Sequence, residues 1–342
     1  MKSVLDALLG GADLTEEQAY AVMRALADAD APVEAVQVGA LLGGLRLKGE
    51  TPDEVKGFVS ALRDLAIRPE LPEDLADTPM VDLCGTGGDG SGSLNLSTGG
   101  ALLAAAAGAH VVKHGNRAIS SRSGSADVLK TLGLPPEAPE AQHMAGLQAG
   151  RFAFLFAPRY HPALKAVATQ RRSLGVRTVF NLMGPLVNPA RPQFQVVGAF
   201  SLEAARLMAQ ALFRLPMPHR AFVVHGAEGW DEATPVGPFT LLKVGQSGVE
   251  ETVVDPQEVY GIPRCTAADL AGGDAAYNAA AIEAVFDGEQ SPHRHALVLG
   301  AALVLEVCGL AESPQQARTL AEAALDEGKA RANLDTLRGC HR

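Results

Sequence analysis

The sequence of 342 residues has few cysteines, and its four, Cys84, Cys265, Cys308 and Cys340, lie far apart. Because no Cys-x-x-Cys pair occurs, a disulfide framework and a structural zinc site are disfavoured and reduced thiols are expected. The chain also lacks any run of about 18 apolar residues that could span a membrane, and it has no apolar segment typical of a signal peptide. We therefore expect a cytoplasmic protein with no membrane partner.

An excess of positive charge is absent as well. Lys and Arg number 29 against 39 Asp and Glu, which gives a formal net charge of −10. Nucleic-acid-binding proteins are more often basic, so we expect no nucleic-acid partner. Any phosphate site must then be a local basic patch on an acidic surface. With 47% hydrophobic and 20% charged residues, the composition is ordinary for a globular protein.

Up to about residue 65 the pattern predicts helices only. Residues 15–18 (TEEQ) and 51–54 (TPDE) are capping boxes, and apolar residues follow them at helical spacing. A segment of this size buries only a modest core by itself, so we expect it to pack on a partner subunit or on a returning piece of the chain. From residue 78 onward, strands alternate with helices, which indicates a largely parallel sheet covered by helices.

These patterns predict two domains. A small N-terminal all-helical domain spans residues 1–68, and a large α/β domain with a mostly parallel central sheet flanked by helices spans residues 74–342. The segment 180–189 interrupts the strand–helix alternation with Gly, Pro and Asn corners. We therefore expect a crossover segment near 170–190 to join the two domains.

A glycine-rich loop follows the first predicted strand. The apolar run 80–83 leads into glycines at 85, 87, 88, 90 and 92, which let backbone N–H groups approach a ligand closely. Asn95, Ser97 and Thr98 then supply side-chain donors and an N-cap where an Ala/Leu-rich helix begins. A strand, a glycine loop and a helix N-terminus together predict an anion site.

Other interpretations of this loop fit less well. Gly85, Gly87 and Gly90 match the dinucleotide-binding pattern G-x-G-x-x-G, but the helix begins only near Ser97 and no acidic residue follows about 20 positions on. No Gly-Lys-Ser/Thr follows, so the loop is not a Walker loop. An ordinary flexible Gly/Ser loop remains an alternative on this stretch alone.

A second loop, residues 113–125, also follows a strand and opens a helix. It contains three cations, one histidine and four serines, which are suitable phosphate donors. A solvated basic loop is the alternative. Two such loops in tandem favour a ligand site, because both would lie at the carboxyl edge of one sheet, where open α/β proteins bind ligands.

Five motifs, in order along the chain, closely resemble the anthranilate phosphoribosyltransferases. They are GTGGD at 85–89, NLST at 95–98, KHGNR at 113–117 with SS at 120–121 and GSAD at 124–127, FNLMGPLVNP at 180–189, and HGAEGWDE at 225–232. The resemblance extends from the N-terminal helices to the C-terminus. It implies the nucleoside phosphorylase/phosphoribosyltransferase type of fold, with the site in the cleft between the domains and a homodimer formed through the helical domain.

The resemblance implies transfer of phosphoribose from phosphoribosyl pyrophosphate (PRPP) to the amine of anthranilate, with release of pyrophosphate, in tryptophan biosynthesis. It implies these substrate-binding residues: Gly85, Gly88, Asp89, Ser93, Asn95, Leu96, Ser97, Thr98, Lys113, His114, Gly115, Asn116, Arg117, Ser121, Ser125 and Arg171. Asn116 and Arg171 would hold anthranilate, the arginine pairing with its carboxylate, and the neighbouring Arg172 competes for this role.

For the metal, the resemblance implies Mg²⁺ held by Ser97, Asp231 and Glu232. Adjacent carboxylates facing a pyrophosphate would repel it unless a cation lay between, and Mg²⁺ takes one or two carboxylates plus phosphate oxygens. We identify no catalytic base, because the amine of anthranilate is already a usable nucleophile. His114 is as well explained as a hydrogen-bond donor or a structural histidine.

Two other functions fit parts of the pattern. A pyrimidine nucleoside phosphorylase-like enzyme would share the architecture and the basic loop, but it has no need for the Asp-Glu pair at 231–232. A non-catalytic relative that binds nucleic acid is disfavoured by the net charge of −10 and by the intact pyrophosphate motifs.

Overall fold

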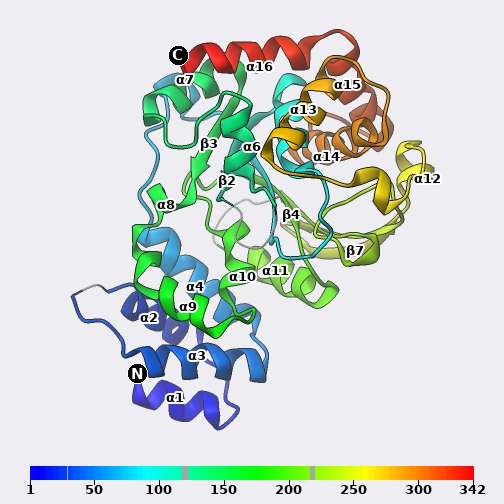
Figure 1. Cartoon of the computed structure of the whole chain (residues 1–342). Helices are drawn as coiled ribbons and strands as arrows, with labels where there is room; N and C mark the ends of the chain where they lie inside the picture. The colour runs from blue at the N-terminus through cyan, green and yellow to red at the C-terminus, as the bar shows by residue number, and fades with distance from the viewer. Residues whose placement is uncertain (29, 118–121, 216–219) are drawn as a thin grey trace.

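The computed structural model describes residues 1–28, 30–117, 122–215 and 220–342. Figure 1 shows a smaller helical part that holds the N-terminus and a larger part in which helices surround a sheet. The fold predicted from the sequence, a small N-terminal helical domain and a large α/β domain, is confirmed. Among the described residues, no helix combines the length and apolarity needed to cross a membrane.

The N-terminal helices are α1 (Lys2–Leu9), α2 (Glu16–Leu26), α3 (Ala35–Lys48) and α4 (Pro52–Leu65). Both predicted capping boxes are confirmed: the Thr15 side chain accepts from the Gln18 backbone N–H, and Thr51 accepts from that of Glu54. Two later helices return to these four, because α9 (Ala168–Leu174) contacts α3 and α10 (Phe180–Met183) contacts α4.

The sheet has seven strands in the order β3-β2-β1-β4-β5-β6-β7. Its strands are β1 (Met80–Gly85), β2 (His110–Gly115), β3 (Phe152–Phe156), β4 (Phe194–Gly198), β5 (Arg220–His225), β6 (Phe239–Gly245) and β7 (Gly248–Val254). The first five are parallel, and β6 and β7 are antiparallel to their neighbours. The carboxyl ends of β1, β2 and β5 therefore lie along one edge of the sheet.

The remaining helices complete the two layers. They are α5 (Leu96–Ala106), α6 (Ser125–Thr131), α7 (Glu140–Gly150), α8 (Ala157–Tyr160), α11 (Leu202–Arg214), α12 (Pro256–Tyr260), α13 (Ala275–Phe286), α14 (Pro292–Cys308), α15 (Pro314–Asp326) and α16 (Lys329–Cys340). Short 3-10 turns are η1 (Glu73–Leu75), η2 (Pro162–Val167), η3 (Gly184–Leu186), η4 (Ala227–Gly229) and η5 (Ala267–Leu270).

Two large apolar cores flank the sheet. On one face, α5 and α14 pack together over Leu83 and Val196. On the other face, α11 and α4 meet Val197 and Val223, and this core runs on without a break into the N-terminal helices. Residues 179–187 belong to the same core. The apolar faces of the first helices are thus partly covered by a returning piece of the chain, one of the two covers expected from the sequence.

Candidate functional site

The loops that follow β1 and β5 meet at Asp231. Its carboxylate accepts from the Gly87 backbone N–H at 2.5 Å and from the Thr86 hydroxyl at 3.3 Å, while its own N–H donates to Asp89 Oδ2 at 3.3 Å. Asp231 is buried. Gly87 and Gly88 have φ values of 70° and 74°, a conformation that favours glycine. The first predicted loop is therefore bent around a carboxylate that lies 144 residues away in sequence.

Glu232 approaches the start of α5. Its Oε1 accepts from the Ser97 backbone N–H at 3.2 Å. Lys113 Nζ, from the end of β2, donates to Ser97 Oγ at 3.3 Å and to the Leu83 carbonyl. Lys113 is a buried cation, with only 2% of its surface exposed. The three predicted metal ligands, Ser97, Asp231 and Glu232, thus lie at one place, next to Lys113.

Burial raises the pKa of Asp231, and the charge of Asp89 adds to this shift. Burial also raises the pKa of Glu232, to which the charges of Asp231 and Asp89 add. Such carboxylates ionise readily only beside a cation. Among the described residues no three His, Cys, Asp or Glu side chains form a group that could hold a metal ion alone. Mg²⁺ requires only one or two carboxylates and completes its shell with water and phosphate oxygens, so Ser97, Asp231 and Glu232 fit this ion.

The N-cap predicted among Asn95, Ser97 and Thr98 is only partly right. Asn95 stands at the N-cap position of α5, but its side chain forms no cap hydrogen bond. Its Oδ1 instead accepts from Asn278 at 2.7 Å, and its Nδ2 donates to the Ser123 carbonyl at 3.1 Å. Thr98 Oγ1, one turn into the helix, is buried with no hydrogen-bond partner among the described residues. The Asn95 side chain therefore bonds Asn278 and Ser123, from two other segments, and does not cap α5.

Ser93 and Leu96 lie on either side of Asn95. The Ser93 hydroxyl is 3.2 Å from that of Ser91, which donates to Asp89 Oδ1 at 3.0 Å. Leu96 is buried in the apolar core, so only its backbone is available to a ligand.

His114, near the end of β2, is buried. Its Nδ1 lies 3.2 Å from the Gly184 carbonyl oxygen, and its ring centroid lies 5.2 Å from that of His161. Burial, with the nearby His161, lowers the pKa of His114 to about 3, and burial lowers the pKa of His161 to about 4. Both rings are therefore neutral near pH 7, which favours a structural or hydrogen-bonding role for His114.

The other predicted residues of the second loop differ in their surroundings. Asn116 is exposed, and the Ser125 hydroxyl donates to its carbonyl oxygen at 3.2 Å. A side chain on Gly115 would overlap Ser125, so the backbone must pass close here. Arg117 forms an ion pair with Glu137, and its charge is already compensated. Ser121 lies outside the described residues.

Arg171 and Arg172 differ in their surroundings. The Arg171 guanidinium carbon lies 4.4 Å from the centroid of the Phe180 ring, and burial lowers the pKa of this arginine. Arg172, one position on, is exposed. Arg171 has no carboxylate partner in the part of the chain that the structure describes. Of the two, Arg171 is the one held in place by an aromatic ring.

Three residues of the site escaped prediction from the sequence. Thr86 bonds Asp231, Asn278 bonds Asn95, and Gly198 ends β4 directly against the backbone of Asp231. A Cβ added at Gly198 would lie 2.6 Å from the Asp231 carbonyl carbon. Gly198 could have been suspected from its place at the end of a predicted strand, whereas nothing local marks Asn278.

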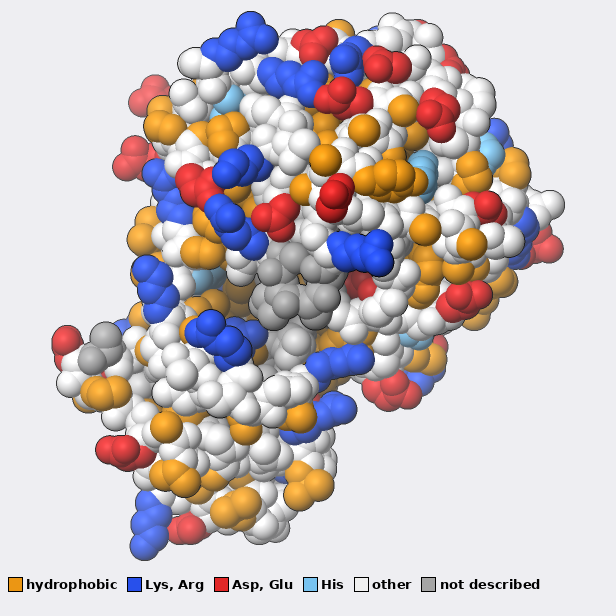
Figure 2. Space-filling model, in the orientation of Figure 1, with side chains coloured by type: hydrophobic (Ala, Val, Ile, Leu, Met, Phe, Trp, Pro, Cys, Tyr) orange, Lys and Arg blue, Asp and Glu red, His pale blue; other side chains and the backbone are white. Residues whose placement is uncertain are grey.

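One segment of the chain lies at the junction of the two parts. Segment 180–189 contacts both, because α10 packs on α4 while Asn188 Nδ2 donates to the buried Asp82 of β1 at 2.8 Å. Figure 2 shows Lys and Arg side chains gathered around this junction on one face of the molecule.

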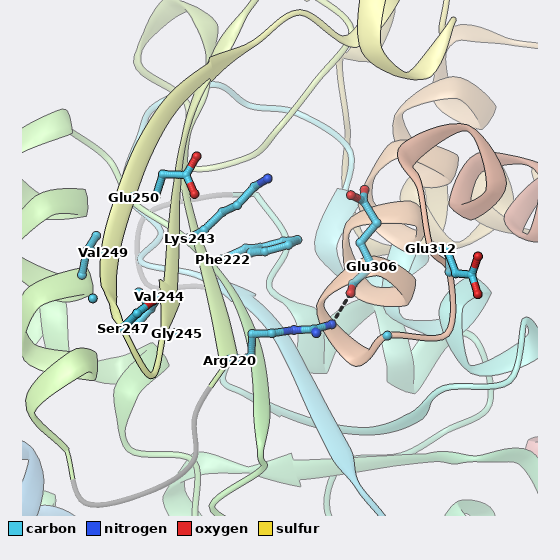
Figure 3. Close-up of a pocket in the computed structure, with 13 residues that line it drawn as sticks. Arg220, Phe222, Lys243, Val244, Gly245, Ser247, Val249, Glu250, Glu306 and Glu312 are labelled. Atoms are coloured by element: carbon cyan, nitrogen blue, oxygen red, sulfur yellow. Dashed lines mark hydrogen bonds between the residues drawn. The ribbon is translucent and has the colours of Figure 1, made fainter.

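An open pocket of about 710 Å³ lies elsewhere, at the amino end of β5. Figure 3 shows Arg220, Phe222 and Lys243 on its sheet side, facing Glu306 and Glu312. Because Arg220 opens β5, the pocket is at the opposite edge of the sheet from Asp231. It does not belong to the site.

Comparison with known proteins gave consistent matches. Residues 77–331 match the family model described as the a/b domain of a glycosyl transferase family, and residues 2–66 match the helical bundle domain of that family. The chain is similar to the anthranilate phosphoribosyltransferase of Desulforudis audaxviator, with 44% identity over 98% of this chain and 95% of the relative.

Solved structures agree. The crystal structure of anthranilate phosphoribosyltransferase from Thermus thermophilus has a TM-score of 0.91 and 40% identity, and the match covers 99% of each chain. The Saccharomyces cerevisiae enzyme in complex with PRPP and Mg has a TM-score of 0.88 over 99% of this chain and 97% of its own. Its identity is 23%, so this second likeness concerns the fold.

Proposed function

Because the chain belongs to the anthranilate phosphoribosyltransferases of the glycosyl transferase family, we propose that its site transfers the phosphoribosyl group of PRPP to the amine of anthranilate. The products are N-(5-phosphoribosyl)anthranilate and pyrophosphate, and the reaction belongs to tryptophan biosynthesis. One observation carries this proposal: the glycine loop, Lys113 and the pair Asp231–Glu232 converge at one edge of the sheet.

Breaking the bond between ribose C1 and pyrophosphate leaves positive charge on the sugar and negative charge on the leaving group. The enzyme has to hold and neutralise the pyrophosphate, place the amine and exclude water. Backbone N–H groups of the glycine loop, the N-terminus of α5 and the ammonium of Lys113 supply the positive field. No strong base is required, and the neutral, buried His114 is left without that role.

Mg²⁺ fits beside Ser97, Asp231 and Glu232. The yeast relative is described in complex with PRPP and Mg. In this chain, burial and nearby negative charge disfavour the ionised forms of Asp231 and Glu232, and a bound cation would stabilise them. Bound there, Mg²⁺ would offset negative charge on the departing pyrophosphate. Asp231 would also keep its bonds to Gly87 and Thr86 and so couple the glycine loop to the metal site.

We assign the domains as residues 1–68 and 74–342, with the acceptor held between them. Arg171, on the helical side of the junction, would pair with the anthranilate carboxylate, and Asn116 would contact the same substrate. The stacking of Arg171 on Phe180 supports this choice, since it fixes the guanidinium without using its hydrogen-bond donors.

Arg171→Ala is expected to raise the KM for anthranilate strongly and to leave the KM for PRPP nearly unchanged. Removing the charge-assisted partner of a carboxylate costs roughly 1.5–3 kcal/mol, or about 10- to 150-fold. Arg172→Ala is the matched control, because that neighbour is exposed, and both KM values should stay within about twofold. A defect of Arg171→Ala confined to PRPP would contradict the assignment.

We also propose that the chain forms a homodimer through its helical domain. Leu9 of α1 and Val36 and Leu47 of α3 are large apolar side chains that remain 69%, 78% and 90% exposed in the single chain. A second copy would cover these exposed apolar side chains on two contacting helices.

Leu47→Asp is expected to convert the dimer to a monomer, because it would bury an unpaired charge in the interface. Sedimentation at micromolar concentration measures this directly. Leu310→Asp, at an exposed apolar position of the α/β domain, is the control and should leave the dimer intact. A wild-type chain that sediments as a stable, active monomer would reject the proposal.

The reaction itself is tested by product mass. Incubation with PRPP, Mg²⁺ and anthranilate should yield N-(5-phosphoribosyl)anthranilate, whereas a pyrimidine nucleoside with inorganic phosphate should yield no free base. Phosphorolysis of the nucleoside, without the transfer product, would instead identify a phosphorylase.

A further inference from the structure

The glycine loop is braced by a segment from the C-terminal third of the chain. This segment is distant in sequence from both the glycine loop and the second loop. Residues 270–272, which begin at the last residue of η5 and precede α13, run antiparallel to residues 92–94. The Leu94 N–H donates to the Leu270 carbonyl at 3.0 Å, and the Gly272 N–H donates to the Gly92 carbonyl at 2.9 Å. A Cβ added at Gly272 would lie 2.7 Å from the Leu94 nitrogen. The end of the glycine loop is therefore held by backbone hydrogen bonds from this segment.

The polar centre of this brace is Asn278, on the first turns of α13. Only 2% of its surface is exposed. Its Oδ1 accepts from the Gly273 N–H at 2.7 Å, and its Nδ2 donates to Asn95 Oδ1 at 2.7 Å. Because a backbone N–H occupies the oxygen, the amide has one orientation, and its nitrogen must face Asn95.

The bond from Asn278 in turn fixes Asn95. With its Oδ1 occupied by Asn278, Asn95 must turn its Nδ2 away, toward the Ser123 carbonyl at 3.1 Å. The relay from Asn278 through Asn95 to Ser123 joins the C-terminal brace, the start of α5 and the second loop. This relay sets the distance between the glycine loop and the second loop, both of which the proposed function assigns to PRPP.

We propose that Asn278 is a positioning residue for PRPP, which acts through Asn95 and does not touch the substrate. This inference rests on the proposed function of the two loops. Without the Asn278 amide, the Asn95 amide is no longer restricted to one orientation, and the Gly273 N–H loses its buried acceptor. The cost falls on PRPP binding, because among the described residues the two anthranilate residues have other neighbours: Asn116 accepts from Ser125, and Arg171 stacks on Phe180.

The test measures PRPP affinity by calorimetry in the presence of Mg²⁺, together with both KM values. Asn278→Ala should weaken PRPP about 10-fold, the loss expected from one buried hydrogen bond, and leave the anthranilate KM unchanged. Asn278→Asp, of equal size, keeps the acceptor for Gly273 but loses the donor to Asn95, and it should show the same loss. Asn333→Ala is the control: this half-buried amide on α16 donates to the Gly150 carbonyl at 3.0 Å, and PRPP affinity should not change.

A double-mutant cycle distinguishes loss of the hydrogen bond between Asn278 and Asn95 from a general loss of protein stability. In an Asn95→Ala background, Asn278→Ala should cause no further loss of PRPP affinity, since its partner is already gone. Equal losses in both backgrounds would overturn the proposal, as would a lowered melting temperature with unchanged PRPP affinity. The binding readout needs no turnover, so a wild-type chain that made no product would reject the reaction while the cycle still decided the role of Asn278.

Discussion

Asp231→Asn combined with Glu232→Gln is expected to abolish Mg²⁺-dependent turnover while the fold survives. The loss should be roughly 10²–10³-fold in kcat or more, the range for removing electrostatic stabilisation of a developing charge. The fold should persist because the new Asn can still accept from Gly87 and Thr86. Neutral amides also remove the repulsion between two buried carboxylates, so the melting temperature should not fall.

The control for this double variant is Glu250→Gln with Glu251→Gln. These adjacent acids on β7 change the net charge by the same amount, and both are exposed. Glu251 pairs with Arg206 at the surface. Turnover should be unchanged. Full activity of the folded Asp231/Glu232 variant, or of the wild type in excess chelator, would disprove the metal site.

Gly198→Ala is expected to cause the second large effect. The new Cβ would overlap the Asp231 backbone, with its carbonyl carbon at 2.6 Å, and neither the strand β4 nor the paired Gly85 on β1 leaves room for a shift. Overpacking of this kind costs roughly 3 kcal/mol. Since Asp231 holds the glycine loop, turnover and PRPP affinity should fall together with the melting temperature.

Gly339→Ala serves as the matched substitution for Gly198→Ala. Gly339 is exposed on α16 with nothing within 4 Å of an added Cβ, so stability should rise by at most about 1 kcal/mol. Wild-type stability and PRPP affinity in Gly198→Ala would show that Asp231 is not packed against the strand ends.

The sequence predicts those features of the fold that depend on residues close together in the chain. The capping boxes at Thr15 and Thr51 depend on neighbours three residues away, and both were predicted correctly. The glycine loop could be recognised for the same reason, since Gly87 and Gly88 need positive φ whatever lies around them. The parallel strands followed from the alternation of strands and helices.

Distant contacts could not be predicted in this way. Asn95 has the composition of an N-cap, but its side chain bonds Asn278, 183 residues away. Arg117 belongs to a basic loop, but its charge is paired with Glu137 on the segment after α6. Gly198 looks like any glycine at a strand end until Asp231 is placed beside it. In each case the decisive partner comes from another element of the fold.

The release of pyrophosphate tests the central claim most directly. Initial rates would be measured for the wild-type chain with PRPP, anthranilate and Mg²⁺ together, and with each omitted in turn. Release should be rapid only in the complete mixture, since the leaving group departs as the amine of anthranilate takes its place on ribose. No release from the complete mixture, or an equal rate without anthranilate, would contradict the assignment of this site to phosphoribosyl transfer.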